Sequence, residues 1–328
     1  MPLRGHLWTI APRVRHRFRP LPLPESRAWE TTLEDPVAGP VRLTGRWREV
    51  PGSEEALILV HGLGGCTDSH YLHGGIAAAE AAGLSVLRIN LRGADREGED
   101  FYHAGLTADL HAALASEELR PYRRIYALGY SLGGHLALRL GTEPGDPRLA
   151  AVGAICSPLD LALSQREIDS APLWIYRRYL LRSLNGIYAA VAARRPVPIP
   201  VREAARIRTL LEWDDRVVAP RHGFAGAADY YARASVAPRL PDLRVPALLV
   251  SSEWDPMVPA KAVRAALQRP APRLEVRWLK GGGHVAFPRA MDAGLGEGFG
   301  VDAQVVGWLR RTGEVKKKTL PGGRCRER

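Results

Sequence analysis

Short apolar segments alternate with segments of helical periodicity along most of this chain, and glycine-rich turns follow several of the apolar segments. Apolar runs of this length, bounded by turn residues, are typical of strands buried in a sheet. Their alternation with helices predicts a mainly parallel central sheet with helices on both faces. The predicted parallel strands are 57–60, 84–90, 124–128, 150–156, 245–251 and 274–279. An antiparallel pair of strands is predicted before them, at 28–34 and 41–50. The predicted helices are 76–82, 106–119, 132–140, 260–267 and 301–309.

The same alternation divides the chain into predicted regions. Residues 28–157 and 243–311 form the α/β core. Residues 158–242 interrupt the pattern and are too long for a loop, so we expect a helical cap insertion over the carboxyl edge of the sheet. Residues 1–27 are predicted to be an irregular, basic, proline-rich lead-in, and residues 312–328 a basic, disordered tail. The helical periodicity of the cap lies at 174–184 and 201–213.

The positive charge of the chain lies at its two ends. The 328 residues carry a formal net charge of +11. Residues 1–20 contain five arginines and no acidic residue, residues 310–328 carry a net +6, and the remainder is neutral overall. A nucleic-acid-binding domain would carry a basic stripe on its body, so we expect no nucleic-acid partner. The ends are then either solvated or weakly held on anionic phospholipid, where each basic residue contributes about 1 kcal/mol.

Cysteine usage and hydropathy indicate a reducing compartment. Cys66, Cys156 and Cys325 are too few and too scattered for a disulfide framework or a zinc site. No apolar run approaches the roughly 20 residues that span a bilayer. The first 20 residues lack the apolar core and small-residue cleavage site of a signal peptide. We therefore expect a cytoplasmic protein.

The strongest local motif is Gly129-Tyr130-Ser131-Leu132-Gly133, which stands between a predicted strand and a predicted helix. This Gly-x-Ser-x-Gly arrangement is typical of the nucleophile elbow, a tight turn that presents the serine hydroxyl at a helix N-terminus. The helix dipole and free backbone amides there favour negative charge. Ser131 is therefore the candidate nucleophile. The alternative interpretation is a glycine-permissive turn whose serine only caps the helix.

A serine hydroxyl needs a base, and the base needs an acid that orients it. His284 follows three glycines just after the last predicted strand, and Asp255 follows the strand before it. Both positions lie at the sheet edge that carries Ser131. The order Ser131, Asp255, His284 is the order of α/β-hydrolases.

Other carboxylates compete with Asp255 for the role of orienting acid. Asp160 also follows a predicted strand, and Asp214 and Asp215 lie in the predicted cap. Glu253 is two residues from Asp255, and we expect it to point elsewhere.

Acyl chemistry at a serine also requires backbone donors for the oxyanion. We expect one donor to be the amide of Leu132, directly after the nucleophile. The other is expected to be the amide of Leu63, in the glycine turn that follows the first parallel strand. His61 begins that turn, and we interpret it as a structural, hydrogen-bonded residue rather than a catalyst.

Aromatic residues of the predicted cap are candidates for substrate contact. Trp174, Tyr176 and Tyr179 either pack inside the cap or line an apolar substrate pocket. His70 and His73 are three residues apart without accompanying carboxylates, which does not fit a metal site. No P-loop or dinucleotide fingerprint is present in the sequence, so we expect no cofactor and no metal.

The motifs that carry a family resemblance are Gly5-His6-Leu7-Trp8-Thr9, His61-Gly62-Leu63-Gly64-Gly65, Ser69-His70-Tyr71, Asn90-Leu91-Arg92-Gly93, Tyr102-His103-Ala104-Gly105, Trp213-Asp214-Asp215, Ala219-Pro220, Gly223-Phe224 and Tyr230-Tyr231. Together they resemble the YheT-like branch of the α/β-hydrolases, which also holds mammalian ABHD-type membrane lipases and yeast acyl-ester synthase/esterases. Trp8 stands where this branch usually has Gln, and His135 where Asn is common. The triad motifs of the branch fall on Ser131, Asp255 and His284.

The resemblance implies an α/β-hydrolase fold and hydrolysis of carboxylic esters without a cofactor. It also implies acyl transfer to alcohols as an alternative activity. We therefore expect a serine esterase that acts on short- to medium-chain acyl esters or lipid esters through an acyl-enzyme. An O-acyltransferase that uses the same site and a non-catalytic acyl-lipid binder are the alternatives. The sequence does not fix the oligomeric state.

Overall fold

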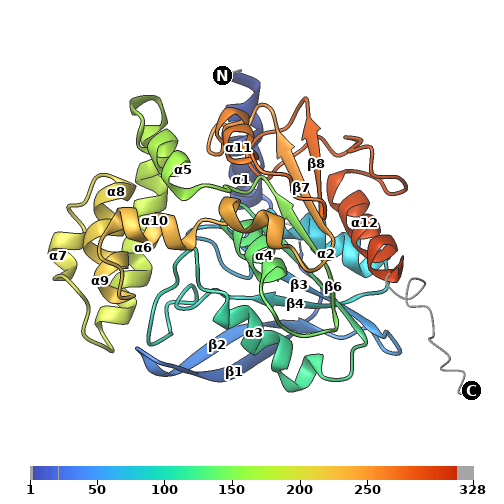
Figure 1. The fold of residues 1–328 in the computed structure, drawn as a ribbon, viewed down its shortest axis with the longest axis horizontal. Helices are drawn as coiled ribbons and strands as arrows, with labels where there is room; N and C mark the ends of the chain where they lie inside the picture. The colour runs from blue at the N-terminus through green and yellow to red at the C-terminus, as the bar shows by residue number, and fades with distance from the viewer. Residues whose placement is uncertain (1–2, 21, 316–328) are drawn as a thin grey trace, which may run out of the picture.

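An eight-stranded sheet forms the centre of the computed structural model, which describes residues 3–20 and 22–315 (Figure 1). The strands are β1 Arg27–Asp35, β2 Gly39–Arg48, β3 Glu55–Val60, β4 Ser85–Ile89, β5 Arg124–Tyr130, β6 Leu149–Ile155, β7 Ala247–Ser252 and β8 Leu274–Leu279. Their spatial order is β1-β2-β4-β3-β5-β6-β7-β8. β1, β2 and β4 pair antiparallel, and all other neighbours are parallel. The predicted mostly parallel sheet and its antiparallel leading pair are confirmed.

Helices cover both faces of this sheet (Figure 1). They are α1 Leu3–Phe18, α2 Leu72–Ala81, α3 Ala108–Ala115, α4 Leu132–Thr142, α5 Leu161–Asp169, α6 Trp174–Ala192, α7 Val201–Ala204, α8 Leu210–Trp213, α9 Ala219–Arg221, α10 Ala227–Ala234, α11 Ala260–Ala266 and α12 Val301–Val315. None of the helices within the described ranges combines the length and the apolarity that crossing a bilayer requires. The cytoplasmic location stays a prediction.

Alternate residues of the central strands explain why the sheet has a core on each face. Every residue of β3 is buried, as expected for a strand covered on both sides. Ile58 packs in the cluster that includes Leu136 of α4, whereas Leu57 and Leu59 pack in the cluster that includes Ile76 of α2 and residues of α12. Because successive side chains of a strand point to opposite faces, one short apolar run supplies both cores.

The strand–helix alternation stops after β6 and resumes at β7. The intervening residues 161–242, which we call the helical insertion, contain α5 to α10 and project to one side of the sheet (Figure 1). The helical spacing over 201–213 corresponds to two short helices, α7 and α8, which a non-helical stretch separates. Thr209 starts α8 by accepting a hydrogen bond from the Glu212 amide. The exact boundaries of core and cap stay a prediction.

Two expectations for the chain ends need correction. The predicted irregular lead-in over 1–27 is wrong for Leu3–Phe18, which form α1 despite Pro12. Contacts with the core hold this helix, since Gly5 is buried against the backbone of Trp254. α12 extends to Val315, so the first residues of the predicted tail 312–328 are helical, and residues 316–328 lie outside the described residues.

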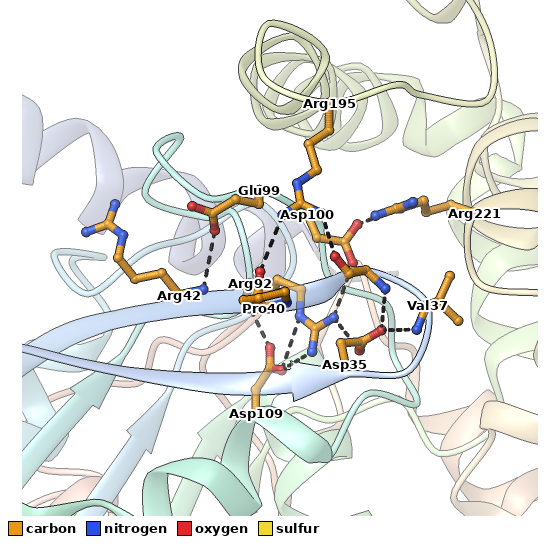
Figure 2. Close-up of polar contacts among 11 residues, drawn as sticks. Asp35, Val37, Pro40, Arg42, Arg92, Glu99, Asp100, Asp109, Arg195 and Arg221 are labelled. Atoms are coloured by element: carbon orange, nitrogen blue, oxygen red, sulfur yellow. Dashed lines mark hydrogen bonds and ion pairs between the residues drawn. The ribbon is translucent and has the colours of Figure 1, made fainter.

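A buried ion network joins the sheet to the helical insertion (Figure 2). Arg92, which follows β4 and is 1% exposed, donates to Asp35 at 2.7 Å, to Asp109 at 2.6 Å and to Asp100 at 3.2 Å. Arg221 of α9 donates to the other oxygen of Asp100 at 2.7 Å. Burial raises the pKa of the Asp35 carboxyl, but hydrogen bonds from Arg92 and two backbone amides outweigh it and lower that pKa to about 2. The network therefore connects β1, α3 and α9 through charged groups.

Candidate active site

Ser131 occupies a strained turn between β5 and α4. Its φ of 53° and ψ of −122° lie in a region that residues with side chains rarely adopt. A Cβ on Gly129 would overlap the carbonyl of Gly133, and a Cβ on Gly133 would overlap the carbonyl of Val60. Both glycines are therefore required by close backbone contacts, and the turn presents Ser131 at the N-terminus of α4.

His284 and Asp255 form a buried pair. The Nδ1 atom of His284 lies 2.9 Å from Oδ2 and 3.1 Å from Oδ1 of Asp255. The Asp255 carboxylate also accepts hydrogen bonds from the Met257 and Val258 amides at 2.8 and 2.9 Å. These amides fix the carboxylate, and the carboxylate fixes the imidazole so that its Nε2 edge is left for another partner.

A large cavity brings the serine and the histidine to one site. The cavity has a volume of about 790 Å³, and both Ser131 and His284 line it. Ser131 comes from the β5–α4 turn, and His284 from the loop after β8. The structure thus places these residues at the same edge of the sheet, as the sequence predicts from the carboxyl ends of parallel strands. Among residues 3–20 and 22–315, no group of three His, Cys, Asp or Glu side chains could hold a metal ion.

The competing carboxylates have other partners. Asp160 caps α5 by accepting a hydrogen bond from the Leu163 amide at 2.9 Å. Glu253 accepts from Arg264 at 2.8 Å. Asp214 lines the cavity, but its carboxylate accepts a hydrogen bond from the Tyr231 hydroxyl at 2.7 Å, whereas the carboxylate on His284 Nδ1 is that of Asp255. Asp255 is therefore the acid that the fold delivers to His284.

Two tyrosines hold the glycine turn that faces Ser131. The Gly62 amide donates to the Tyr71 hydroxyl at 2.9 Å, and the Gly64 amide donates to the Tyr102 hydroxyl at 2.6 Å. The amide of Leu63, between them, has no acceptor among the residues that the structure describes. A Cβ on Gly62 would lie only 3.0 Å from the Cβ of Ser131. The turn thus leaves one free donor beside the serine.

His61 is a structural, hydrogen-bonded residue, as expected from its place at the start of the glycine turn. Its Nε2 accepts a hydrogen bond from the Leu91 amide at 3.0 Å, so Nδ1 carries the proton and donates to the Gly62 carbonyl at 2.8 Å. Burial lowers the pKa of His61 to about 4, despite that hydrogen bond. The neutral imidazole therefore sets the direction of the glycine turn and does not exchange protons near neutral pH.

Of the three aromatic candidates in the helical insertion, two contact the cavity. Tyr176 and Tyr179 line it, together with Leu180, Leu184 and other apolar residues of α6. Trp174 does not line it and is 51% exposed, so its assignment to the pocket is wrong. The reason is helical geometry, because a residue two positions before Tyr176 points about 200° away from it around the helix.

The contribution of α1 to this site is not evident from the sequence. The Thr9 hydroxyl accepts a hydrogen bond from the His284 amide at 2.8 Å and donates to the Gly5 carbonyl at 2.8 Å. His6 Nδ1 lies 2.8 Å from the Tyr176 hydroxyl. These contacts come from the Gly5-His6-Leu7-Trp8-Thr9 motif, which packs against the loop of His284 and against α6.

His135 explains one departure from the family pattern. It is fully buried in α4, with Nδ1 2.9 Å from the Pro158 carbonyl and Nε2 2.9 Å from the Ala234 carbonyl. Ala234 belongs to α10, so the imidazole packs between α4 and the helical insertion. Burial lowers the pKa of His135, so its neutral ring carries one N–H and donates to one of these two carbonyls. His135 is thus a structural link.

Comparison with known proteins identifies the family. Residues 57–293 match the family model of the alpha/beta hydrolase family. The chain is 32% identical to the putative esterase YheT of Escherichia coli over 309 residues, which cover 88% of this chain and 86% of that protein. It is 27% identical to the medium-chain fatty acid ethyl ester synthase/esterase 2 of Saccharomyces cerevisiae (70% of this chain, 57% of that protein). It is 24% identical to phospholipase ABHD3 of Homo sapiens (70% and 58%).

Solved structures agree with the fold. The crystal structure of the alpha/beta hydrolase GrgF from Penicillium sp. sh18 matches with a TM-score of 0.57 at 19% identity, over 88% of this chain and 99% of that chain. The Pyrococcus furiosus esterase Pf2001 matches with a TM-score of 0.53 at 18% identity, over 90% and 92%. The chain belongs to the α/β-hydrolase family, and the predicted resemblance to its YheT-like branch is confirmed. Hydrolysis of carboxylic esters in general is the activity that this membership supports.

Proposed function

We propose that this protein is a serine esterase in which Ser131, Asp255 and His284 form a catalytic triad. The observation that carries the proposal is the buried His284–Asp255 pair on the same cavity as a strained elbow serine. Backbone strain of the kind seen at Ser131 clusters at functional sites. The chain order of the three residues is that of the family.

In the proposed first step, His284 Nε2 removes the Ser131 proton while Oγ attacks the carbonyl carbon of the ester. The carbonyl π electrons move to oxygen and form a tetrahedral oxyanion. Asp255 stays ionised, accepts the Nδ1–H of His284 and stabilises the imidazolium. The hydrogen bonds from Met257 and Val258 hold this carboxylate in place through the step.

The amides of Leu63 and Leu132 are the proposed oxyanion donors. Leu132 is the first residue of α4, and both residues line the cavity beside Ser131. Each such donor contributes about 2.7–4 kcal/mol to transition-state stabilisation. The intermediate then collapses, the C–O bond to the alcohol breaks, and His284 returns the proton to the leaving alkoxide. His284 then takes a proton from water while the water oxygen attacks the acyl carbon. It gives that proton to Ser131 Oγ as the bond between Oγ and the acyl carbon breaks and the acid leaves.

The cavity supports acyl esters as the substrate class. Its volume of about 790 Å³ lies in the range of small-molecule sites, roughly 300–1,000 Å³. Apolar side chains of the helical insertion, among them Leu180, Leu184 and Ile187, form much of its wall. Such a wall binds an aliphatic chain by excluding water. We therefore propose short- to medium-chain acyl esters or lipid esters as substrates.

The proposal is tested by turnover of p-nitrophenyl esters from acetyl to palmitoyl. Ser131→Ala is expected to lose activity by about 10³-fold or more, because the acyl-enzyme can no longer form. The wild-type rate is expected to peak at short to medium chains. Near wild-type activity of the Ser131→Ala variant, with its fold verified by circular dichroism, would contradict the proposal.

Acyl transfer to an alcohol is a second candidate, because a yeast relative is an ethyl ester synthase/esterase. The same acyl-enzyme would then be attacked by an alcohol in place of water. Adding ethanol or glycerol to the ester assay and detecting new esters by mass spectrometry separates the two activities. Binding without catalysis, the remaining alternative, predicts no acyl-enzyme with any ester in the panel.

A further inference from the structure

The first helix presents its apolar side chains to solvent. Leu3, Leu7, Ile10, Val14 and Phe18 are 82%, 65%, 43%, 47% and 77% exposed. At 100° per residue these five positions fall on one narrow stripe of α1. The opposite face contacts the protein through small and polar residues, namely Gly5 against Trp254 and Thr9 against His284. An ordinary surface helix buries its apolar stripe against the core, so this helix has the reverse orientation.

Arginine side chains flank the exposed stripe on both sides. The five arginines of residues 1–20 have no acidic residue among them. By helical geometry, Arg4 and Arg15 lie along one border of the stripe and Arg13 and Arg17 along the other. An apolar stripe bordered by basic residues is the pattern of helices that lie in the plane of a membrane interface.

The stripe is continuous with the mouth of the cavity. Ile10 and Val14 line the cavity although each is more than 40% exposed, so they stand at its opening. On the other side of the opening, Ile175 of α6 lines the cavity and is 54% exposed, and the neighbouring Trp174 is 51% exposed. Arg13 stacks on the Tyr179 ring at 3.8 Å and ties the two helices together. Figure 1 shows α1 at the upper side of the molecule with the N-terminus at its outer end.

We propose that α1 and the first turn of α6 dock this protein on an anionic phospholipid surface, with the cavity mouth facing the lipid. This inference rests on the proposed function, because it assigns the docked lipid ester as a substrate for Ser131. The exposed stripe would enter the boundary between headgroups and acyl chains, and the arginines would contact lipid phosphates. Substrate would then pass from the bilayer into the cavity without crossing water.

Charge decides between a membrane and a second copy of the chain. A symmetric dimer built on this face would place the arginines of one α1 against the arginines of the other. Like charges brought together in that way oppose association. Anionic phospholipid neutralises the arginines on both borders of the stripe. The lipid surface is therefore the binding partner that fits this face of α1.

The test is co-sedimentation of the full chain with phosphatidylcholine vesicles that contain or lack phosphatidylglycerol. Wild-type protein is expected to bind the anionic vesicles and to lose binding as salt is raised. Leu7→Gln combined with Phe18→Gln is expected to weaken binding by about tenfold or more. Arg4→Gln combined with Arg15→Gln is expected to weaken binding and to flatten its salt dependence.

A matched pair of substitutions elsewhere controls for loss of surface apolarity. Val37 and Phe299 are 64% and 74% exposed and lie away from α1 in the sequence. Val37→Gln combined with Phe299→Gln is expected to bind vesicles as wild type does. Hydrolysis of a water-soluble ester is expected to be unchanged in all of these double variants, because none of the substituted residues lines the cavity.

The outcomes separate docking from catalysis. Vesicle binding by Ser131→Ala at the wild-type level is expected, so failure of the esterase proposal would leave the docking result readable. Absence of vesicle binding by wild-type protein, or equal loss in the control pair, would overturn the inference. It would also be overturned if light scattering showed a wild-type dimer that Leu7→Gln with Phe18→Gln dissociates, because a second copy would then be the occupant.

Discussion

Thr9 links the first helix to the loop that carries His284. Its hydroxyl is the acceptor for the His284 amide, and its own proton goes to the Gly5 carbonyl. Thr9→Val keeps the shape but removes the acceptor, which leaves a backbone amide without its partner at a cost of about 1–3 kcal/mol. We expect kcat for a soluble ester to fall about tenfold as the histidine shifts, with a smaller change in KM.

The conservative variant distinguishes positioning from general stability. Thr9→Ser keeps the hydroxyl and is expected to retain most of the wild-type kcat. Equal losses in the valine and serine variants, measured by steady-state kinetics with thermal unfolding as the fold check, would contradict a positioning role for the hydroxyl.

Asp214 gives the site region a pH-dependent stability. Burial raises its pKa to about 7, and the nearby Asp169 adds to that rise although the Tyr231 hydrogen bond opposes it. A raised pKa means that the folded state binds the proton more tightly. Protonation of Asp214 therefore contributes fully to the free energy of unfolding below the ordinary pKa of 3.8. This contribution declines as pH rises from about 4 to about 7.

Asp214→Asn removes this titration and keeps an acceptor for Tyr231. The stability of the variant relative to wild type is expected to increase with pH by at most about 1.4 kcal/mol per pH unit across that window. Denaturant unfolding of both proteins at pH 5 and pH 8 measures it. A difference that is constant between the two pH values would show that Asp214 does not titrate there.

At the scale of the elements, the backbone of α1 packs against the loop that carries Asp255. Gly5 is buried, and a Cβ at this position would overlap the Trp254 carbonyl. Gly5→Ala is expected to push α1 away from the core, weaken the Thr9–His284 contact and lower kcat for soluble esters about tenfold. Arg15→Ala, on the exposed border of the same helix, is the control and is expected to keep wild-type kinetics. Unchanged kinetics of Gly5→Ala would show that α1 docking is independent of the site.

Most strands and core helices are predictable from the sequence because their apolar periodicity is local. β3 and β7 are short apolar runs, and α4 and α12 repeat apolar residues at helical spacing. α1 is not predictable in that way, because its inward face is formed by Gly5 and Thr9 and its apolar stripe faces solvent. The helical spacing over 201–213 also gives no sign of the break between α7 and α8, where Thr209 caps the start of α8.

The site is predictable to the extent that strand ends determine it. Ser131, Asp255 and His284 all follow parallel strands, so topology alone brings them to one edge. Contacts that depend on side-chain geometry are not accessible from the sequence. The hydroxyls of Tyr71 and Tyr102 that hold the glycine turn are examples, and so is the outward direction of Trp174.

At the scale of the whole molecule, the Arg92 network couples the sheet to the helical insertion (Figure 2). Arg92→Met leaves buried carboxylates without a counter-ion and is expected to lower the free energy of unfolding by about 3–5 kcal/mol. The partners of Arg42 are exposed. Arg42→Met is therefore expected to change the free energy of unfolding by at most about 1 kcal/mol. Urea unfolding of both variants measures the contrast, and similar effects would contradict a special role for the buried network.

The lowered pKa of Asp35 adds a pH signature to this network. A carboxylate with a pKa of about 2 contributes stability that is present above its ordinary value of 3.8 and is lost as pH falls toward 2. Burial opposes this lowering, and the hydrogen bond from Arg92 is the largest contribution that favours it. Arg92→Met is therefore expected to be less sensitive to pH between about 4 and 2 than wild type. A variant that loses stability as steeply as wild type over this range would contradict the assignment.

Reaction of the wild-type chain with a fluorophosphonate tests most directly whether the strained serine is activated by the histidine pair. The phosphonyl group is expected on the peptide that contains Ser131, as located by tandem mass spectrometry, with a rate that falls by orders of magnitude in His284→Ala. A chain that stays unlabelled, or one labelled equally fast without His284, would contradict the account.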